Sequence, residues 1–393
     1  MRLESGMRRP RSLALGVLAA LSALAALPSG CVPEKGPTAQ GIPVGFFGAL
    51  TGPQATFAQA GRNGARLAVD EINRSGGVLG VRLDLRVEDD HNEPAEAASV
   101  VSKLITRDHV VALIGENASS RSLAAAPIAQ GYKIPMISPS STNVEVTKKG
   151  DYIFRVSFTD ESQGRALAAF ARRNLKASTV AILIDARSDY SVGLADAFAR
   201  DFTAAGGRVV AQPRYTEGDT DFSAQLTALL PVKPDILFLP GYYTDAGLIA
   251  RQARGLGLTA AILGADGFDS PKLTEIGGDA IEGTYFSNHY SPEDPNPAVR
   301  SFAAAYEKAY GIAPDSIAAT SYDAARLVAD AIKRAGSTEG KRVRDALAAT
   351  TDFPGVTGTI SFDADRNPVK ATVIIQVRGG KFRYVTSVPP AAP

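Results

Sequence analysis

The 393-residue sequence contains only one cysteine, Cys31, and three histidines. A single cysteine excludes an intrachain disulfide. His91 follows the acidic run Glu88–Asp90, a combination that can bind a metal ion. No other histidine lies near it in the sequence, and His109 and His289 lack the spacing of metal ligands. We therefore interpret the acidic run as a structural loop after a strand, and we expect no metal site.

An excess of charge of one sign is also absent. The 42 lysines and arginines balance 41 aspartates and glutamates, which leaves a formal net charge of +1. Nucleic-acid-binding proteins present a clustered basic face, whereas the basic cluster here is Arg8, Arg9 and Arg11, at the extreme N-terminus. We therefore expect no nucleic-acid partner. A composition of 45% hydrophobic and 21% charged residues is that of a soluble globular protein, and the length allows two domains.

Motifs for covalent or nucleotide chemistry are missing as well. The sequence has no GxSxG nucleophile elbow. The segment GSTEGK (336–341) is one residue shorter than a GxxxxGK phosphate loop, and GGVLG lacks the spacing of a dinucleotide fingerprint. We predict that the protein is not an enzyme and carries no cofactor.

Long apolar runs are confined to the N-terminus. The three arginines precede SLALGVLAALSALAALPSGC, which ends at Cys31. A positive start, an apolar centre and an exit of small residues are typical of a secretory signal peptide. The alternative is a retained transmembrane helix, for which about 20 apolar residues suffice. The small residues and the polar segment that follows favour cleavage, so we expect a signal peptide at 1–31 and a tether at 32–41.

The segment LPSGC resembles a bacterial lipobox, in which the cysteine becomes a diacylated N-terminus. Ser29 and Gly30 fit this pattern, whereas Pro28 stands where leucine is usual. The resemblance implies lipidation of Cys31 and a membrane anchor. Ordinary cleavage near ALAAL, which would leave a free thiol, is the alternative.

From Ile42 onward, short apolar runs alternate with segments of helical spacing. Several runs, such as VVALI and ILFL, are apolar at every position, as in strands that are covered on both faces. Between such runs, Leu194, Phe198 and Phe202 recur at a spacing of four residues, which indicates one face of a helix. Repeated alternation of this kind predicts an α/β fold with parallel sheets and right-handed crossovers.

The alternation is too long for one compact sheet. DYIFRVSF (151–158) interrupts it, and a new series begins at Val180. We therefore predict two doubly wound parallel-sheet lobes that are joined by more than one crossing. The first lobe is expected to comprise 42–157 and 289–366, and the second 158–288 and 367–386.

Polar loops follow five of the predicted strands and begin GENASS, SPSSTN, DARSDY, PGYYTD and GADGFD. Ligands of open α/β sheets bind outside the carboxyl ends of the strands. The segment MISPSSTN (136–143) supplies four hydroxyl groups where two would cap a helix. We interpret Ser138 and Ser141 as structural and expect the remaining hydroxyls to face a small polar ligand.

The order and spacing of several longer segments carry a resemblance over nearly the whole mature chain. They are VGFFGALTGPQATFAQAGRNGARLAVDEIN (44–73), VEDDHNEPAEAASVVSKLI, YSVGLADAF, GDTDFSAQL, GLIARQARGLG and GTISFDADRNP. Together they resemble the leucine/isoleucine/valine-binding protein family, the type I periplasmic substrate-binding proteins of ABC amino-acid importers. The resemblance implies two lobes linked by a three-strand hinge, with the ligand in the cleft between them. The lobes of such proteins close on the ligand by hinge motion.

The resemblance also implies how an amino acid is held. Ser119 and Thr142 would bind its α-carboxylate, and the backbone carbonyl of Ser140 would help to hold its ammonium group. Asp266 would pair with the ammonium group, and Tyr242 would pack beside it. This chemistry is reasonable because a helix that begins near Ser119 is an anion site, and because a buried cation needs a partner.

Two further aromatic residues complete the implied site. Tyr190 would reach the ligand from the second lobe, and Phe57 would line the side-chain pocket. Asn117 and Ala118 differ from the corresponding residues of branched-chain binders, so the resemblance does not identify the ligand. Branched-chain, aromatic and small polar amino acids remain open, as do amides and short-chain acids.

The expected function is that of an extracytoplasmic binding protein, in the periplasm or cell envelope, that delivers an amino acid to an ABC permease and its ATPase subunits. The family further implies a monomer. A ligand-sensing subunit of a signalling receptor is the alternative, because it uses the same fold. A secreted hydrolase is disfavoured, since no nucleophile and base can be named.

Overall fold

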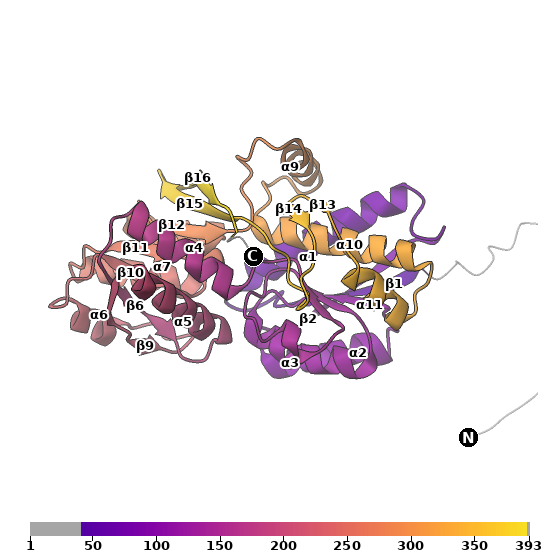
Figure 1. Cartoon of the computed structure of the whole chain (residues 1–393), viewed down its shortest axis with the longest axis horizontal. Helices are drawn as coiled ribbons and strands as arrows, with labels where there is room; N and C mark the ends of the chain where they lie inside the picture. The colour runs from indigo at the N-terminus through magenta and orange to yellow at the C-terminus, as the bar shows by residue number, and fades with distance from the viewer. Residues whose placement is uncertain (1–40, 391–393) are drawn as a thin grey trace, which may run out of the picture. The chain divides into compact units, whose positions relative to one another are not determined.

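The computed structural model describes residues 41–390 (Figure 1). The predicted signal peptide, most of the tether and Cys31 lie outside the described residues. Within residues 41–390, no helix combines the length and the apolar character that crossing a membrane requires. Two separate sheets organise this part of the chain, and the predicted α/β class is confirmed.

The first sheet has five strands, and every pair in it is parallel. Its spatial order is β2-β1-β3-β4-β5. The strands are β1 (Ile42–Gly48), β2 (Leu83–Asp89), β3 (Ala112–Ile114), β4 (Met136–Ser138) and β5 (Ile153–Arg155). Its crossover helices are α1 (Ala55–Arg74), α2 (Pro94–Thr106) and α3 (Ser119–Tyr132), with a short turn of helix, η1 (Thr147–Lys149), before β5.

The second sheet has seven strands in the order β16-β15-β12-β11-β10-β6-β8. They are β6 (Thr179–Ile182), β8 (Arg208–Ala211), β10 (Ile236–Leu239), β11 (Ala261–Gly264), β12 (Tyr285–Asn288), β15 (Thr372–Arg378) and β16 (Lys381–Val388). The helices are α4 (Asp160–Arg173), α5 (Asp189–Ala204), α6 (Ser223–Leu229), α7 (Tyr243–Gly255), α8 (Pro271–Gly277), η2 (Asp266–Phe268) and η3 (Gly278–Ile281). Two short strands, β7 (Ile184–Asp185) and β9 (Arg214–Tyr215), form a separate parallel pair. In the sequence they alternate with strands of the seven-stranded sheet.

The second sheet departs from the all-parallel arrangement at one edge. β15 runs antiparallel to β12, and β16 runs antiparallel to β15. The hairpin between β15 and β16 turns at Gly379 and Gly380, whose φ angles are +58° and +67°. Two consecutive residues with positive φ are what a tight hairpin turn requires, and glycine adopts them without strain.

The remaining elements lie between β12 and β15 in the sequence. They are α9 (Pro297–Tyr310), α10 (Ser316–Ala335), α11 (Gly340–Ala348) and the hairpin β13 (Phe353–Gly355) and β14 (Gly358–Ile360). The long helix α10 begins where Asp315 accepts a hydrogen bond from the Ala318 N–H at 2.8 Å, and it ends at Gly336 in the left-handed conformation. It packs closely along α1, because a Cβ atom on Gly64 would lie only 2.0 Å from the carbonyl oxygen of Ala318.

Buried apolar side chains cover both sheets. On the first sheet, one face packs against α1 and α10 and the other against α2 and α3. In α5, which belongs to the part built on the seven-stranded sheet, Leu194, Phe198 and Phe202 are fully buried, as their spacing predicted. The core that contains α10 also holds side chains of α9, α11 and the β13–β14 hairpin, so these elements complete the part built on the first sheet.

The chain passes between the two sheets three times, in the segments 156–159, 289–296 and 361–371. We call the part built on the five-stranded sheet the first lobe and the part built on the seven-stranded sheet the second lobe. We keep the lobe boundaries predicted from the sequence as a proposal.

Candidate functional site

The loop after β3 is fixed by hydroxyl groups. The carbonyl oxygen of Glu116 accepts hydrogen bonds from Ser138 at 2.7 Å and from Ser141 at 2.9 Å. Ser122 donates a third, at 3.0 Å. Ser138 and Ser141 therefore hold the two polar loops of the first lobe together, which is the structural role that their position suggested.

The Glu116 side chain holds the same loop from within. Its carboxylate is buried and accepts hydrogen bonds from the backbone N–H groups of Ala49 at 3.3 Å and Ala118 at 2.5 Å. It also forms a buried ion pair with Arg121, at 3.2 Å. Ser140 then binds the next residue of the loop, since its hydroxyl donates to the Asn117 carbonyl oxygen at 2.9 Å. The backbone that carries Asn117 and Ser119 is thus held on several sides.

Helix α3 begins at Ser119, and its N-cap residue, Ala118, offers no capping side chain. The Ser119 hydroxyl instead accepts a hydrogen bond from the Asn143 N–H at 3.2 Å, and the Ser120 hydroxyl accepts one from the Asp189 N–H at 3.0 Å. Neither serine acts as a helix cap. The first N–H groups of a helix have no partner within it, and with the helix dipole they favour an anion at this end.

The second lobe contributes a buried carboxylate. Asp266 starts η2, directly after β11, and is 5% exposed. Its Oδ1 accepts hydrogen bonds from Tyr190 and from Gln163, both at 2.6 Å, and its Oδ2 lies 3.1 Å from Nε2 of His289. The oxygen of Tyr190 accepts in turn from the Gly267 N–H at 3.2 Å. Burial, together with the charge of Asp266, raises the pKa of Tyr190 well above its ordinary value, so the phenol remains a donor.

Two of these partners of Asp266 were missed by the sequence analysis. His289 directly follows β12, so the rule that ligands bind at strand ends could have pointed to it. Its ring packs on Phe158 with centroids 3.9 Å apart. Gln163 lies in the first turn of α4, and no pattern in the sequence distinguishes it from other helical glutamines.

The two lobes enclose a small cavity. Its lining residues are Phe57, Asn117, Ser119, Ser140, Tyr190, Tyr242, Asp266, Gly267 and Ile317. Six of the seven predicted ligand-binding residues are among them. The seventh, Thr142, is fully buried nearby, and its hydroxyl has no hydrogen-bond partner, but it does not line the cavity.

Aromatic rings from both lobes close the cavity. The ring of Phe57, on the first lobe, meets the ring of Tyr242, on the second, at 6.1 Å, and Tyr242 lies 5.2 Å from Tyr190. The free space is about 10 Å³, close to what one water molecule needs. An amino acid can therefore enter only if the lobes or these side chains move apart.

Polar contacts at the edge of the cavity also join the lobes. Glu217, on the second lobe, accepts hydrogen bonds from Gln54 at 2.8 Å and from Asn92 at 3.1 Å. Arg121 supports Gln54 through a hydrogen bond of 2.5 Å. Thr244 donates to the Pro53 carbonyl oxygen at 2.8 Å. The structure is therefore a closed arrangement of the two lobes.

A buried acid, Asp160, lies close to this site at the start of α4. Neither of its carboxyl oxygens has a hydrogen-bond partner, and the residue is 2% exposed. A Cβ atom on Gly193 would lie 2.9 Å from Asp160 Oδ2, so only glycine allows this close approach. Burial, with a contribution from the charge of Asp266, raises the pKa of Asp160 to about 8. At neutral pH this group therefore carries its proton.

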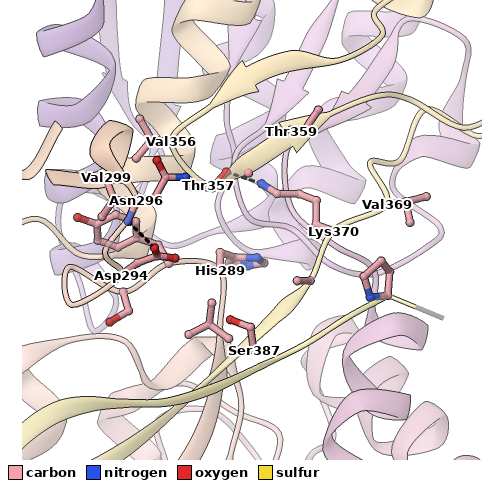
Figure 2. A pocket seen from close by; sticks show the side chains of 16 residues that line it. His289, Asp294, Asn296, Val299, Val356, Thr357, Thr359, Val369, Lys370 and Ser387 are labelled. Carbon is pink, nitrogen blue, oxygen red and sulfur yellow. Dashed lines mark hydrogen bonds between the residues drawn. The ribbon is translucent and has the colours of Figure 1, made fainter. Parts of the chain in front are cut away.

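A separate pocket is lined mainly by the crossing segments 289–296 and 361–371 and by the β13–β14 hairpin (Figure 2). Figure 2 shows Lys370 extending toward Thr357, to which its ammonium group donates a hydrogen bond. Lys370 also donates to the Val156 carbonyl oxygen at 3.3 Å. Burial lowers the pKa of Lys370 to about 8. These contacts tie crossing segments to one another, and none of the predicted ligand-binding residues lines this pocket.

In residues 41–390, no group of three or more His, Cys, Asp or Glu side chains is placed to hold a metal ion. His91 lies 3.0 Å from the Thr51 hydroxyl and 3.1 Å from the Asp89 carboxylate, in the loop that follows β2. The acidic run thus takes part in local loop contacts.

Comparisons with known proteins agree with this architecture. The model of the family described as periplasmic binding protein matches residues 41–381. The chain is 32% identical, over 326 residues, to the leucine-, isoleucine-, valine-, threonine- and alanine-binding protein of Pseudomonas aeruginosa, which covers 82% of this chain and 86% of the relative.

Two solved structures show the same fold over nearly their whole length. The leucine-binding protein LivK of Thermotoga maritima is 38% identical, with a TM-score of 0.86, and the match covers 89% of this chain and 99% of that one. The branched-chain amino-acid binding protein LivJ of Streptococcus pneumoniae, solved with isoleucine, is 36% identical, with a TM-score of 0.85 and coverage of 89% and 100%.

Proposed function

Because the chain belongs to the periplasmic binding protein family, we propose that it is the substrate-binding protein of an ABC importer and binds an amino acid between its lobes. One observation carries this proposal: a single cavity combines neutral donors from the first lobe with a buried carboxylate from the second. Such a pair of surfaces complements the two charged ends of a zwitterion.

The anionic end of the ligand would lie at the N-terminus of α3. Ser119 stands at the first position of that helix, and the helix dipole attracts a carboxylate there. Ser140 lines the same cavity from the neighbouring loop, and its hydroxyl already donates to the Asn117 carbonyl oxygen. Since these donors are neutral, the carboxylate is bound without a buried cation that would itself need a partner.

The cationic end would lie against Asp266. Its carboxylate is already oriented by Tyr190, Gln163 and His289, which come from α5, α4 and the start of the crossing segment 289–296. A hydrogen bond to a charged group contributes about 1.5–3 kcal/mol. A few such bonds support micromolar binding, which corresponds to about −8 kcal/mol.

Closure of the lobes would complete the site. Tyr242 and Phe57 meet across the cavity, and Glu217 joins the lobes at its edge. A ligand that contacts both lobes favours the closed state by its differential affinity for that state. The closed form is the one that a permease would recognise.

The binding step is tested by calorimetry of purified protein against the common amino acids, after a thermal-shift screen. A ligand present at 100 times its dissociation constant adds about 2.7 kcal/mol to stability, so a true ligand raises the melting temperature visibly. Failure of every amino acid to bind would refute the proposal. Mass spectrometry of the ligand after incubation tests its non-enzymatic character, because recovery of a changed ligand would contradict passive binding.

The transport role is tested in cells. Deletion of the gene should abolish high-affinity uptake of the labelled ligand, and the permease and ATPase subunits should be needed as well. Undiminished uptake would instead favour a ligand-sensing subunit, which would use the same cavity. Family membership implies an extracytoplasmic location in either case.

We further propose that Cys31 carries the lipid anchor, on the basis of the LPSGC segment. This residue lies outside the described residues. Cys31→Ser should move the protein from the membrane pellet to the soluble fraction, and it should abolish labelling with a palmitate analogue. A variant that still pellets and still incorporates the analogue would contradict the anchor.

A further inference from the structure

One polar group in the cavity has no partner. Asn117 lines the cavity and is 6% exposed, yet its amide nitrogen, Nδ2, makes no hydrogen bond. Most other polar side chains there are engaged: Ser119 accepts from the Asn143 N–H, Ser140 donates to the Asn117 carbonyl oxygen, and Tyr190 donates to Asp266. A buried polar group without a partner is unfavourable, so this amide is unusual within the site.

Rotation of the Asn117 amide by half a turn does not give both of its ends a hydrogen-bond partner. The oxygen Oδ1 has only a long contact of 3.4 Å with the Ser140 hydroxyl, which already donates to the Asn117 carbonyl oxygen at 2.9 Å. Exchanging the amide oxygen and nitrogen would therefore leave a polar end unpaired as before.

Asn117 is positioned to contact the side chain of a bound amino acid rather than its charged groups. Under the proposed function, Ser119 and the N-terminus of α3 serve the carboxylate, and Asp266 serves the ammonium group. Of the other lining groups, Phe57 and Ile317 are apolar, and Asn117 lies on the same cavity with a free donor. The lining left for a ligand side chain therefore comprises apolar groups, the ring of Tyr242 and this amide.

We propose that the Asn117 amide donates a hydrogen bond to the ligand side chain, and that the site selects amino acids with a short hydroxyl or carboxamide side chain. Threonine, serine and asparagine are such ligands. A side chain of the same shape without an acceptor leaves the amide unpaired, which disfavours it. This inference rests on the proposed function and narrows the ligand class.

The test compares ligands of nearly equal shape by calorimetry: threonine with valine, asparagine with leucine, and serine with alanine. We expect the polar member of at least one pair to bind about tenfold more tightly, which corresponds to 1.4 kcal/mol. Asn117→Leu keeps the approximate volume and removes the donor, so it should lower this ratio to one or below and leave the affinity for the apolar member equal or higher.

Asn174→Leu is the matched control, because Asn174 is exposed on the second lobe and does not line the cavity. It should leave all ratios unchanged. If Asn117→Leu does not fold, Asn117→Ala provides the same comparison, and the ratios of the wild-type protein are decisive by themselves. The inference is wrong if no polar member binds more tightly, or if a folded Asn117 variant keeps the ratio. Failure of every amino acid to bind would instead overturn the proposed function, and this inference with it.

Discussion

The two lobes build their halves of the cavity in different ways. The polar groups of the first lobe come from two loops that are close in the sequence, and hydroxyl groups join these loops through one carbonyl oxygen, that of Glu116. The second lobe collects Gln163, Tyr190 and His289 around Asp266 from three distant segments. The first half is neutral and held by backbone contacts, whereas the second is charged and held by side chains.

This difference has a consequence for binding. Several neutral donors share the anion, so the loss of one hydroxyl leaves the helix N-terminus in place. The carboxylate is a single group on which the ammonium end depends entirely. We therefore expect substitutions in the second lobe to have larger effects on affinity than substitutions in the first.

The largest effect is expected for Asp266→Ala. Loss of the charged partner should weaken amino-acid binding by about 10- to 150-fold, the range that corresponds to 1.5–3 kcal/mol. Calorimetry of the purified variant measures this change. Asp279→Ala removes an exposed carboxylate from the same lobe and is the control. Equal affinities for the two variants would show that Asp266 is not the ammonium partner.

A smaller effect is expected for Ser119→Ala, which removes one of several donors. The affinity should fall by about tenfold, at the lower end of the range for a hydrogen bond to a charged group. The free energy of unfolding should fall less than for Ser138→Ala, because the Ser119 hydroxyl makes one hydrogen bond within the protein, of 3.2 Å, and that of Ser138 makes two.

Ser138→Ala is the matched comparison on the same loops. Its hydroxyl donates to Glu116 and accepts from the Ser141 N–H at 2.9 Å, but it does not line the cavity. The free energy of unfolding should fall by about 1–3 kcal/mol, because buried groups lose their partner, while the affinity of the folded protein stays near that of the wild type. If Ser119→Ala and Ser138→Ala behaved alike, the division into binding and structural hydroxyls would be wrong.

The same contrast between the lobes explains what could be predicted from the sequence. Strand–helix alternation depends on local periodicity, so the α/β class followed from runs such as VVALI and ILFL. The polar loops of the first lobe were visible because their serines are clustered in the sequence. Ser138 and Ser141 could be separated from Ser140 only by analogy, since their hydroxyls differ in direction rather than in sequence context.

Other features depend on long-range packing and left no local signal. Gln163 reaches Asp266 across 103 positions of the sequence, and Glu217 reaches Gln54 across 163. The antiparallel edge formed by β15 and β16 was also not expected, because strand direction is not encoded in hydrophobic spacing. Thr142, assigned by resemblance, does not line the cavity, which shows that a motif match does not fix where a side chain points.

A further expected effect concerns stability rather than affinity, and it tests the charged half of the site. Asp160 has an ordinary pKa of 3.8, which burial and the charge of Asp266 raise to about 8 in the folded protein. Between these values the folded state holds a proton that the unfolded chain has lost. Stability should therefore fall as pH rises through this window, by up to about 1.4 kcal/mol per pH unit for one group.

Asp160→Asn removes this contribution, because a carboxamide of the same shape does not ionise. The free energy of unfolding, measured with urea at several pH values between 5 and 8, should therefore decline less steeply with pH than in the wild type. Part of the slope should persist, since burial also raises the pKa of Asp90 to about 8 and that of Asp245 to about 7. Asp279→Asn is the control at an exposed position. Identical slopes for Asp160→Asn and the wild type would mean that Asp160 is ionised in the folded protein, and hence that water or another group reaches it beside Asp266.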